Sequence, residues 1–197
     1  MVNHEKKIAF IHVPKCAGSS INQTLNLKVH AGTGHAGWKA HANLFKDGYF
    51  TFSYVRNPWD RMVSLYHYFY NMRRGHQWYG QNKKLATQIS TIGFQEFCAR
   101  LDEFQRCPWS GIHFVPMVNF LQDQKQNINL DFIGKFENLQ EDFDKLCDEL
   151  YLPRQSLPHK NKSDHIKYIE YYDKKSKEMV DKKYARDIEI FNYKFNK

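Results

Sequence analysis

An apolar segment that runs directly into a polar turn constrains the fold of this 197-residue chain more than any other feature. Residues 8–13, Ile-Ala-Phe-Ile-His-Val, are apolar and rich in β-branched side chains, as in a buried parallel strand. The turn Pro14-Lys-Cys-Ala-Gly-Ser-Ser20 follows at once, and residues 21–25 can begin a helix. A strand, a tight turn and a helix in this order predict an α/β fold with an anion site at the helix N-terminus.

The remainder of the chain repeats this alternation of strands and helices. The predicted strands are 8–13, 49–55 and 131–136, and the predicted helical regions begin at 21 and span 58–72, 94–101, 139–150 and 163–190. Two segments lack such a pattern: residues 28–47 are expected to form a loop with at most one helical turn, and residues 73–91 a mobile polar excursion. We therefore predict a single domain over residues 1–197, with a central, mainly parallel sheet flanked by helices.

The turn after the first strand carries the residue types that an anion requires. Gly18 permits close approach to the backbone, Ser19 and Ser20 add hydroxyl donors, and Lys15 adds a full positive charge. The lysine precedes the glycine, whereas in the Walker motif the lysine follows the glycines and a hydroxyl group holds magnesium. This order argues against a magnesium-dependent nucleotide kinase. An ordinary strand-to-helix turn with an exposed lysine remains the structural alternative.

A second strand-to-helix junction, Val55-Arg-Asn-Pro58, adds a second cation. Arg56 stands at the carboxyl end of a predicted strand, where open α/β sheets bind their ligands. Ser64 falls about two turns into the following helix and could share a phosphate with Arg56. Alternatively, Arg56 pairs with Asp60, and Ser64 only fills a helix face.

Together the two junctions resemble a known family. IHVPKCAGSSI and YVRNPWDRMVSLY look like the two motifs that bind 3′-phosphoadenosine 5′-phosphosulfate (PAPS) in sulfotransferases, in the form found in carbohydrate (family 2) sulfotransferases. The segments DFIGKFENLQEDF, LPHKNKS and the C-terminal stretch ending DIEIFNY are similar to the same family in the same order. The resemblance implies a P-loop-NTPase-like sulfotransferase fold, PAPS as co-substrate, adenosine 3′,5′-bisphosphate (PAP) as product, and no metal.

The resemblance also implies roles for individual residues. Arg56 with Ser64 would hold the 3′-phosphate, and the Asn161-Lys162 loop would close over the nucleotide. Family members often carry Gln where this chain has Met117, so the role of that position is open. The 5′-phosphosulfate would be held by the turn residues Pro14, Lys15, Cys16, Ala17, Gly18, Ser19 and Ser20.

The expected reaction is an in-line displacement in which Lys15 stabilises the leaving oxygen and a histidine takes the acceptor proton. The resemblance places that base at His41, just ahead of the second strand, with His35 as the alternative. His12 and His67 are expected to be structural, because they fall inside a predicted strand and a predicted helix. His41 could also be an exposed histidine without a catalytic role.

The acceptor and the cellular setting are less constrained by the sequence. The resemblance suggests a hydroxyl group of a glycan or glycolipid, which Trp78, Tyr79 and the neighbouring Arg73 and Arg74 could contact. The net charge of +8 also fits a basic nucleic-acid-binding module, and a catalytically silent nucleotide-binding relative is a further alternative. Four cysteines without metal-ligand spacing and the lack of a membrane-length apolar run favour a cytoplasmic, bacterial protein without a metal.

Overall fold

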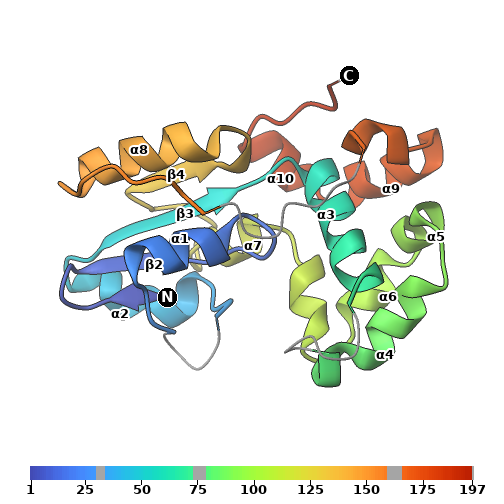
Figure 1. Cartoon of the computed structure of the whole chain (residues 1–197), viewed down its shortest axis with the longest axis horizontal. Helices are drawn as coiled ribbons and strands as arrows, with labels where there is room; N and C mark the ends of the chain where they lie inside the picture. The colour runs from blue at the N-terminus through green and yellow to red at the C-terminus, as the bar shows by residue number, and fades with distance from the viewer. Residues whose placement is uncertain (30–33, 73–78, 159–165, 197) are drawn as a thin grey trace. The chain divides into compact units, whose positions relative to one another are not determined.

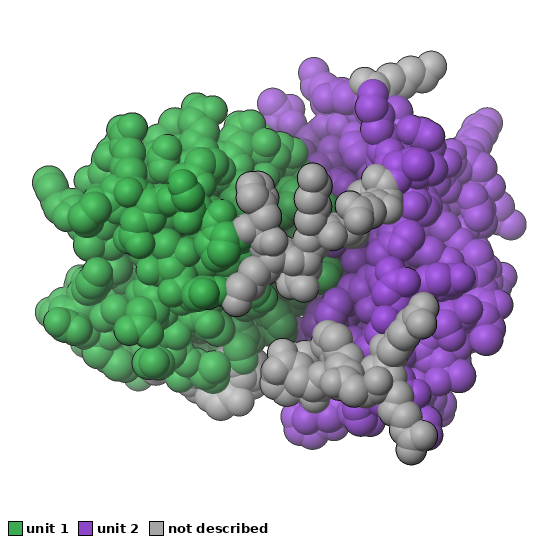
Figure 2. All heavy atoms as spheres, in the orientation of Figure 1, with its two compact units in different colours: residues 1–56, 117–162 green, residues 57–116, 163–197 purple. Residues whose placement is uncertain are grey.

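The computed structural model describes residues 1–29, 34–72, 79–158 and 166–196. The chain divides into two compact units, each built from two separate stretches (Figure 2). The first unit comprises residues 1–56 and 117–162, and the second comprises residues 57–116 and 163–197. The single domain expected over residues 1–197 stays a prediction, and the two units are described separately.

The first unit contains a four-stranded sheet with the strand order β1-β2-β3-β4. Its strands are β1 (Val2–Asn3), β2 (Ile8–Ile11), β3 (Phe50–Val55) and β4 (Phe132–Lys135). β1 pairs with β2 in the antiparallel sense, whereas β2 with β3 and β3 with β4 are parallel. The predicted α/β class with a mainly parallel sheet is confirmed, and each predicted strand lies within one or two residues of its expected bounds.

Aromatic side chains on neighbouring strands pack against one another in the sheet of the first unit. All four residues of β2 are buried, as expected for a strand covered on both faces. Phe10 pairs in register with Phe52, and their rings stack with centroids 4.8 Å apart. Tyr54 pairs with Gly134, and a Cβ atom at Gly134 would lie 2.3 Å from the tyrosine ring. Because Gly134 has no side chain, the Tyr54 ring can occupy the space beside it.

Helices flank this sheet. The helices of the first unit are α1 (Gly18–Leu25), α2 (Trp38–Lys46), α7 (Val118–Leu121) and α8 (Leu139–Glu149), with a 3₁₀ turn η2 (Phe136–Asn138). α8 packs beside β4, and α2 packs beside β2 (Figure 1). The loop expected over residues 28–47 is wrong for residues 38–46, which form α2. Good helix formers and the buried His41 and Leu44, three residues apart on one face, outweigh the glycines before them.

The second unit is helical where it is described. Its elements are α3 (Pro58–Tyr70), α4 (Tyr79–Ser90), α5 (Phe94–Ala99), α6 (Leu101–Gln105), η1 (Ser110–Phe114), η3 (Tyr168–Tyr171), α9 (Lys174–Lys183) and α10 (Ala185–Ile190). The mobile excursion expected over residues 73–91 is wrong for residues 79–90, because Leu85, Ala86 and Ile89 form a buried stripe on α4. Within the described residues, no helix has both the length and the apolar composition that a membrane span requires.

α3 follows β3 directly, and its N-terminus is capped by Asn57. The Asn57 side chain accepts hydrogen bonds from the N–H groups of Trp59 and Asp60, and Pro58 occupies the first turn. One turn later Arg61 is completely buried, and its Nη2 atom donates to the carbonyl oxygens of residues 113 and 115, both at 3.0 Å. Arg61 therefore joins α3 to η1 and to the residue that follows η1.

Candidate active site

The turn after β2 leaves the N-terminus of α1 open. Lys15 and Ala17 adopt left-handed backbone conformations, with φ of 70° and 62°, which is uncommon for non-glycine residues. No side chain caps the helix at Ala17, and the N–H groups of Gly18 and Ser19 have no acceptor among the described residues. A strained turn with unpaired N–H groups at a helix N-terminus is the arrangement that anion sites use.

His12 lies directly against this turn. β2 ends at Ile11, so His12 follows the strand instead of lying inside it as expected. A Cβ atom at Gly18 would lie only 1.8 Å from His12 Nε2, which shows how closely the ring packs on the glycine. The sequence predicted a structural role for His12 because it placed the end of the strand at residue 13. The strand ends two residues before that, at Ile11.

His35 is the neighbour of His12. The two ring centroids are 4.4 Å apart, His12 Nδ1 lies 3.1 Å from the Gly34 carbonyl, and His35 Nδ1 lies 3.3 Å from the His12 carbonyl. In a neutral ring, an Nδ1 atom that bonds a carbonyl carries the proton, which leaves Nε2 as the basic nitrogen. The turn therefore has two histidines beside it in the tautomer that a proton acceptor needs.

His41 has a different environment. It lies in α2 with no solvent exposure, its Nδ1 atom 3.0 Å from the Gly37 carbonyl and its Nε2 atom 3.1 Å from the Met1 amino group. Both ring nitrogens thus contact groups of the protein. The catalytic role of His41 stays a prediction.

Arg56 joins the second junction to the first. Its Nη1 atom donates to the Lys15 carbonyl at 3.1 Å, and its guanidinium lies 3.9 Å from the centre of the Phe136 ring. Arg56 is 7% exposed, at the carboxyl end of β3. Sequence reasoning missed Phe136, although it follows β4 and the carboxyl ends of neighbouring parallel strands meet at one edge of a sheet.

Met117 links the same two junctions. Its Sδ atom accepts from the Arg56 backbone N–H at 3.4 Å and lies 3.9 Å from Cys16 Sγ. Met117 and Cys16 are both buried. The position where family members often carry Gln therefore packs between the turn and the end of β3.

The other predicted site residues are placed as follows. Ser19 is exposed, whereas Ser20 is buried and its hydroxyl donates to the Pro158 carbonyl at 2.8 Å. Ser64 lies buried on α3 in the second unit, so its pairing with Arg56 stays a prediction. Asn161 and Lys162 lie outside the described residues.

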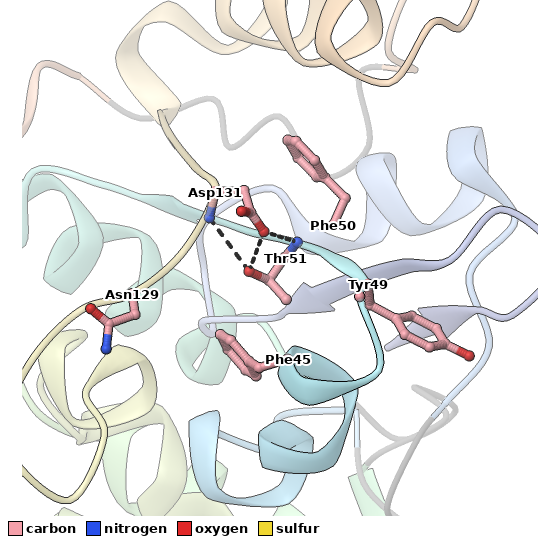
Figure 3. Close-up of a pocket in the computed structure, with 7 residues that line it drawn as sticks. Phe45, Tyr49, Phe50, Thr51, Asn129 and Asp131 are labelled. Atoms are coloured by element: carbon pink, nitrogen blue, oxygen red, sulfur yellow. Dashed lines mark hydrogen bonds between the residues drawn. The ribbon is translucent and has the colours of Figure 1, made fainter.

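A separate cavity of about 450 Å³ lies at the opposite ends of the strands (Figure 3). Thr51, near the start of β3, lines it, whereas Arg56 follows the end of that strand. Asp131 Oδ2 accepts from both the N–H and the hydroxyl of Thr51, each at 2.7 Å. The carboxylate therefore fastens the start of β4 to β3, which is a structural role. Among the described residues, no cluster of three His, Cys, Asp or Glu side chains could hold a metal ion.

Comparison with known proteins decides the family. A family model described as "Sulfotransferase family" matches residues 1–194. The chain belongs to the sulfotransferase family. This sulfotransferase is also 29% identical, over 109 residues, to an uncharacterized protein of Archaeoglobus fulgidus, a match that covers 55% of this chain and 73% of that protein. No solved structure matches it. Family membership supports sulfuryl transfer to a hydroxyl-bearing acceptor as the general chemistry.

Proposed function

We propose that this sulfotransferase takes the sulfuryl group from PAPS and transfers it to a hydroxyl group of a carbohydrate. The observation that carries the proposal is the 3.1 Å hydrogen bond from Arg56 Nη1 to the Lys15 carbonyl. Within the first unit, it links the turn of one PAPS-like motif to Arg56 of the other. An ordinary turn with an exposed lysine would not require a buried arginine from the neighbouring strand.

The residues present fit the donor nucleotide. The open N–H groups of Gly18 and Ser19 suit the oxygens of the 5′-phosphosulfate, and Lys15 supplies the positive charge beside them. Arg56, with its guanidinium already oriented by Phe136, suits the 3′-phosphate, and Ser64 is proposed to join it. PAPS, when bound, supplies a sulfuryl group on a good phosphate leaving group.

The chain's own residues would perform two tasks in the transfer. The acceptor oxygen forms a bond to sulfur while the bond from sulfur to the 5′-phosphate oxygen breaks, and PAP leaves. Lys15 and the two N–H groups stabilise the negative charge that develops on that phosphate oxygen. A histidine Nε2 atom removes the acceptor proton.

We assign the base to His35, with His12 as the residue that positions it. Both rings lie beside the turn, and their Nδ1 contacts favour the tautomer with a basic Nε2 atom. His41, the base expected from the resemblance, is buried and contacts the protein through both nitrogens. The test of function should therefore compare the turnover of variants that lack His35 or His41.

The motifs and the cysteines indicate the acceptor and the cellular setting that we propose. The family 2 form of the motifs favours a sugar hydroxyl. The four free cysteines, Cys16, Cys98, Cys107 and Cys147, are compatible with the reducing cytoplasm that we propose.

The decisive experiment is a transfer assay with ³⁵S-labelled PAPS over a panel of oligosaccharides and simple alcohols. Lys15→Ala should abolish transfer, whereas Lys6→Ala, an exposed lysine before β2, should leave it unchanged. His35→Ala should lower turnover by about 10²- to 10⁴-fold, the effect of losing a general base. If His41→Ala loses that much and His35→Ala does not, our assignment of the base is wrong.

Binding of the product PAP separates nucleotide recognition from catalysis. Calorimetry should show PAP binding to the wild-type protein and much weaker binding to Arg56→Ala. Binding of PAP without transfer to any acceptor would point to a catalytically silent relative. An affinity for oligonucleotides that falls steeply with salt and ignores PAP would support a nucleic-acid module instead.

A further inference from the structure

Trp109 is the most exposed tryptophan that the structure describes. Its side chain is 80% exposed, between α6 and η1 in the second unit. Single exposed apolar side chains are common and need no explanation by themselves. The inference rests on the backbone that presents this one.

Trp109 is the central residue of a strained γ-turn. Its φ and ψ are 63° and −51°, and the Ser110 N–H donates to the Pro108 carbonyl at 2.6 Å. A hydrogen bond between residues two apart, with positive φ at the centre, defines the rarer and less stable form of γ-turn. A bulky side chain is least expected in such a conformation, and strain of this kind is concentrated at functional sites.

The residues after Trp109 hold the turn in place. Ser110 is 2% exposed; its hydroxyl donates to Asn82 Oδ1, and its carbonyl lies 3.0 Å from His113 Nδ1. At Gly111, a Cβ atom would lie 2.0 Å from the Gln105 carbonyl oxygen, so this backbone cannot shift toward α6. A buried support therefore holds the backbone that presents the indole to solvent.

That support belongs to the segment expected to contact the acceptor. Asn82 lies on α4, within residues 73–91, for which the sequence suggested contacts with a polar glycan. The bond from Ser110 to Asn82 thus connects the Trp109 turn to this segment inside the second unit.

The size of the exposed surface selects the kind of partner. Among the described residues of the second unit, Ile112, which is 38% exposed, is the exposed large apolar side chain nearest to Trp109 in sequence. A stable protein interface buries about 800 Å² on each side, whereas one aromatic residue offers roughly 150–250 Å². This area suits the C–H face of a single sugar ring, which packs against the negative face of the indole.

We propose that Trp109 is a stacking platform for one sugar ring of an oligosaccharide acceptor. The proposal rests on the proposed function for the identity of the acceptor, but not for the binding itself. Trp109 does not act on the reacting atoms in this assignment. Its loss should therefore weaken oligosaccharide binding.

The test titrates the full-length protein with cellohexaose, chitohexaose and an unsulfated hyaluronan hexasaccharide, and follows tryptophan emission and calorimetric heat. At least one probe should bind the wild-type protein, and Trp109→Ala should weaken that binding about 3- to 10-fold. Trp109→Phe should recover part of the loss. Tyr151→Ala removes another aromatic residue with positive φ, 95% exposed, and should change nothing.

A stability measurement separates binding from a structural role. Glycine tolerates the γ-turn backbone, so Trp109→Gly should unfold at the same temperature as wild type or higher, and yet bind the probe as weakly as Trp109→Ala. A lower unfolding temperature for Trp109→Gly than for wild type would overturn the proposal, because the indole would then support the fold. So would equal binding by wild type and Trp109→Ala, or no binding of any probe.

These outcomes stay distinct from those of the proposed function. PAP binding should be the same in wild type and Trp109→Ala. Loss of both PAP and oligosaccharide binding in the variant would show general damage and would overturn the proposal. Oligosaccharide binding that depends on Trp109, in a protein that neither binds PAP nor transfers sulfate, would uphold the platform and refute the sulfotransferase activity.

Discussion

Gly18→Ala is a sharp test of the candidate site, because the added methyl group has no room. The new Cβ atom would lie 1.8 Å from His12 Nε2, and an ordinary contact needs at least 3.4 Å. The imidazole must therefore move by about 1.6 Å. It cannot do so and keep both its 3.1 Å contact with the Gly34 carbonyl and its stacking on Phe10, at 5.4 Å.

The cost can be estimated from these contacts. Overpacking costs about 1–3 kcal/mol and the lost hydrogen bond about 1 kcal/mol, while the better helix propensity of alanine returns up to about 1 kcal/mol. We expect the free energy of unfolding to fall by about 1–3 kcal/mol in urea titrations. The affinity for PAP should fall with it, because the displaced ring presses on the turn.

A double-mutant cycle supplies the control. Truncation in His12→Ala removes the clashing ring, so the added Gly18→Ala change should then cost less than about 0.5 kcal/mol. The backbone of Gly18 is not left-handed, so alanine is not disfavoured there for conformational reasons. The reasoning is refuted if Gly18→Ala unfolds like wild type, or if its cost is the same with and without the His12 ring.

Three further predictions test the packing and the electrostatics by chemical denaturation. The buried Tyr54 hydroxyl has no partner among the described residues, so Tyr54→Phe should keep or raise the free energy of unfolding. Tyr184→Phe instead loses a 2.9 Å hydrogen bond to a carbonyl and should cost about 1 kcal/mol. Equal losses in the two variants would contradict this contrast. Arg61→Met leaves two carbonyls without their donor and should cost about 2–4 kcal/mol, so a loss below about 1 kcal/mol would argue against the buried bonds. The hydrogen bond from Lys183 holds the pKa of Asp102 below its usual value, so this pair stabilises the fold above about pH 4 and stops doing so as the pH falls through the lower folded-state pKa. Asp102→Asn should therefore lose stability at pH 6 and not at pH 2, and an equal loss at both would count against the pair.

Local patterns predicted the elements whose signals are local. The parallel strands and the helix that begins at Pro58 follow from apolar runs and from a proline suited to the first turn. α2 and α4 were missed because their polar and glycine-rich surroundings hide short apolar stripes, such as Leu85 and Ile89. Such stripes can be recognised as buried only once the structure shows the surface that packs against them.

The site was predicted in part for the same reason. Lys15 and Gly18 lie at the junction of β2 and α1, and Arg56 directly follows β3; the sequence marks both junctions. The approach of His12 to Gly18 depends on the exact end of β2 and on the packing of a side chain against a backbone, neither of which is encoded by spacing. Phe136 follows β4 and is distant in sequence from Arg56, the residue it contacts.

The chain leaves the first unit at Arg56 and re-enters it at Met117, and this has consequences during synthesis. β3 emerges from the ribosome long before β4, its parallel partner, so one edge of β3 stays unpaired while the intervening helices are made. An unpaired, apolar edge strand is a template for aggregation, and pairing across so long an interval is slow. Nascent chains halted between Val55 and Phe132 should therefore be the form of this protein that depends most on chaperones.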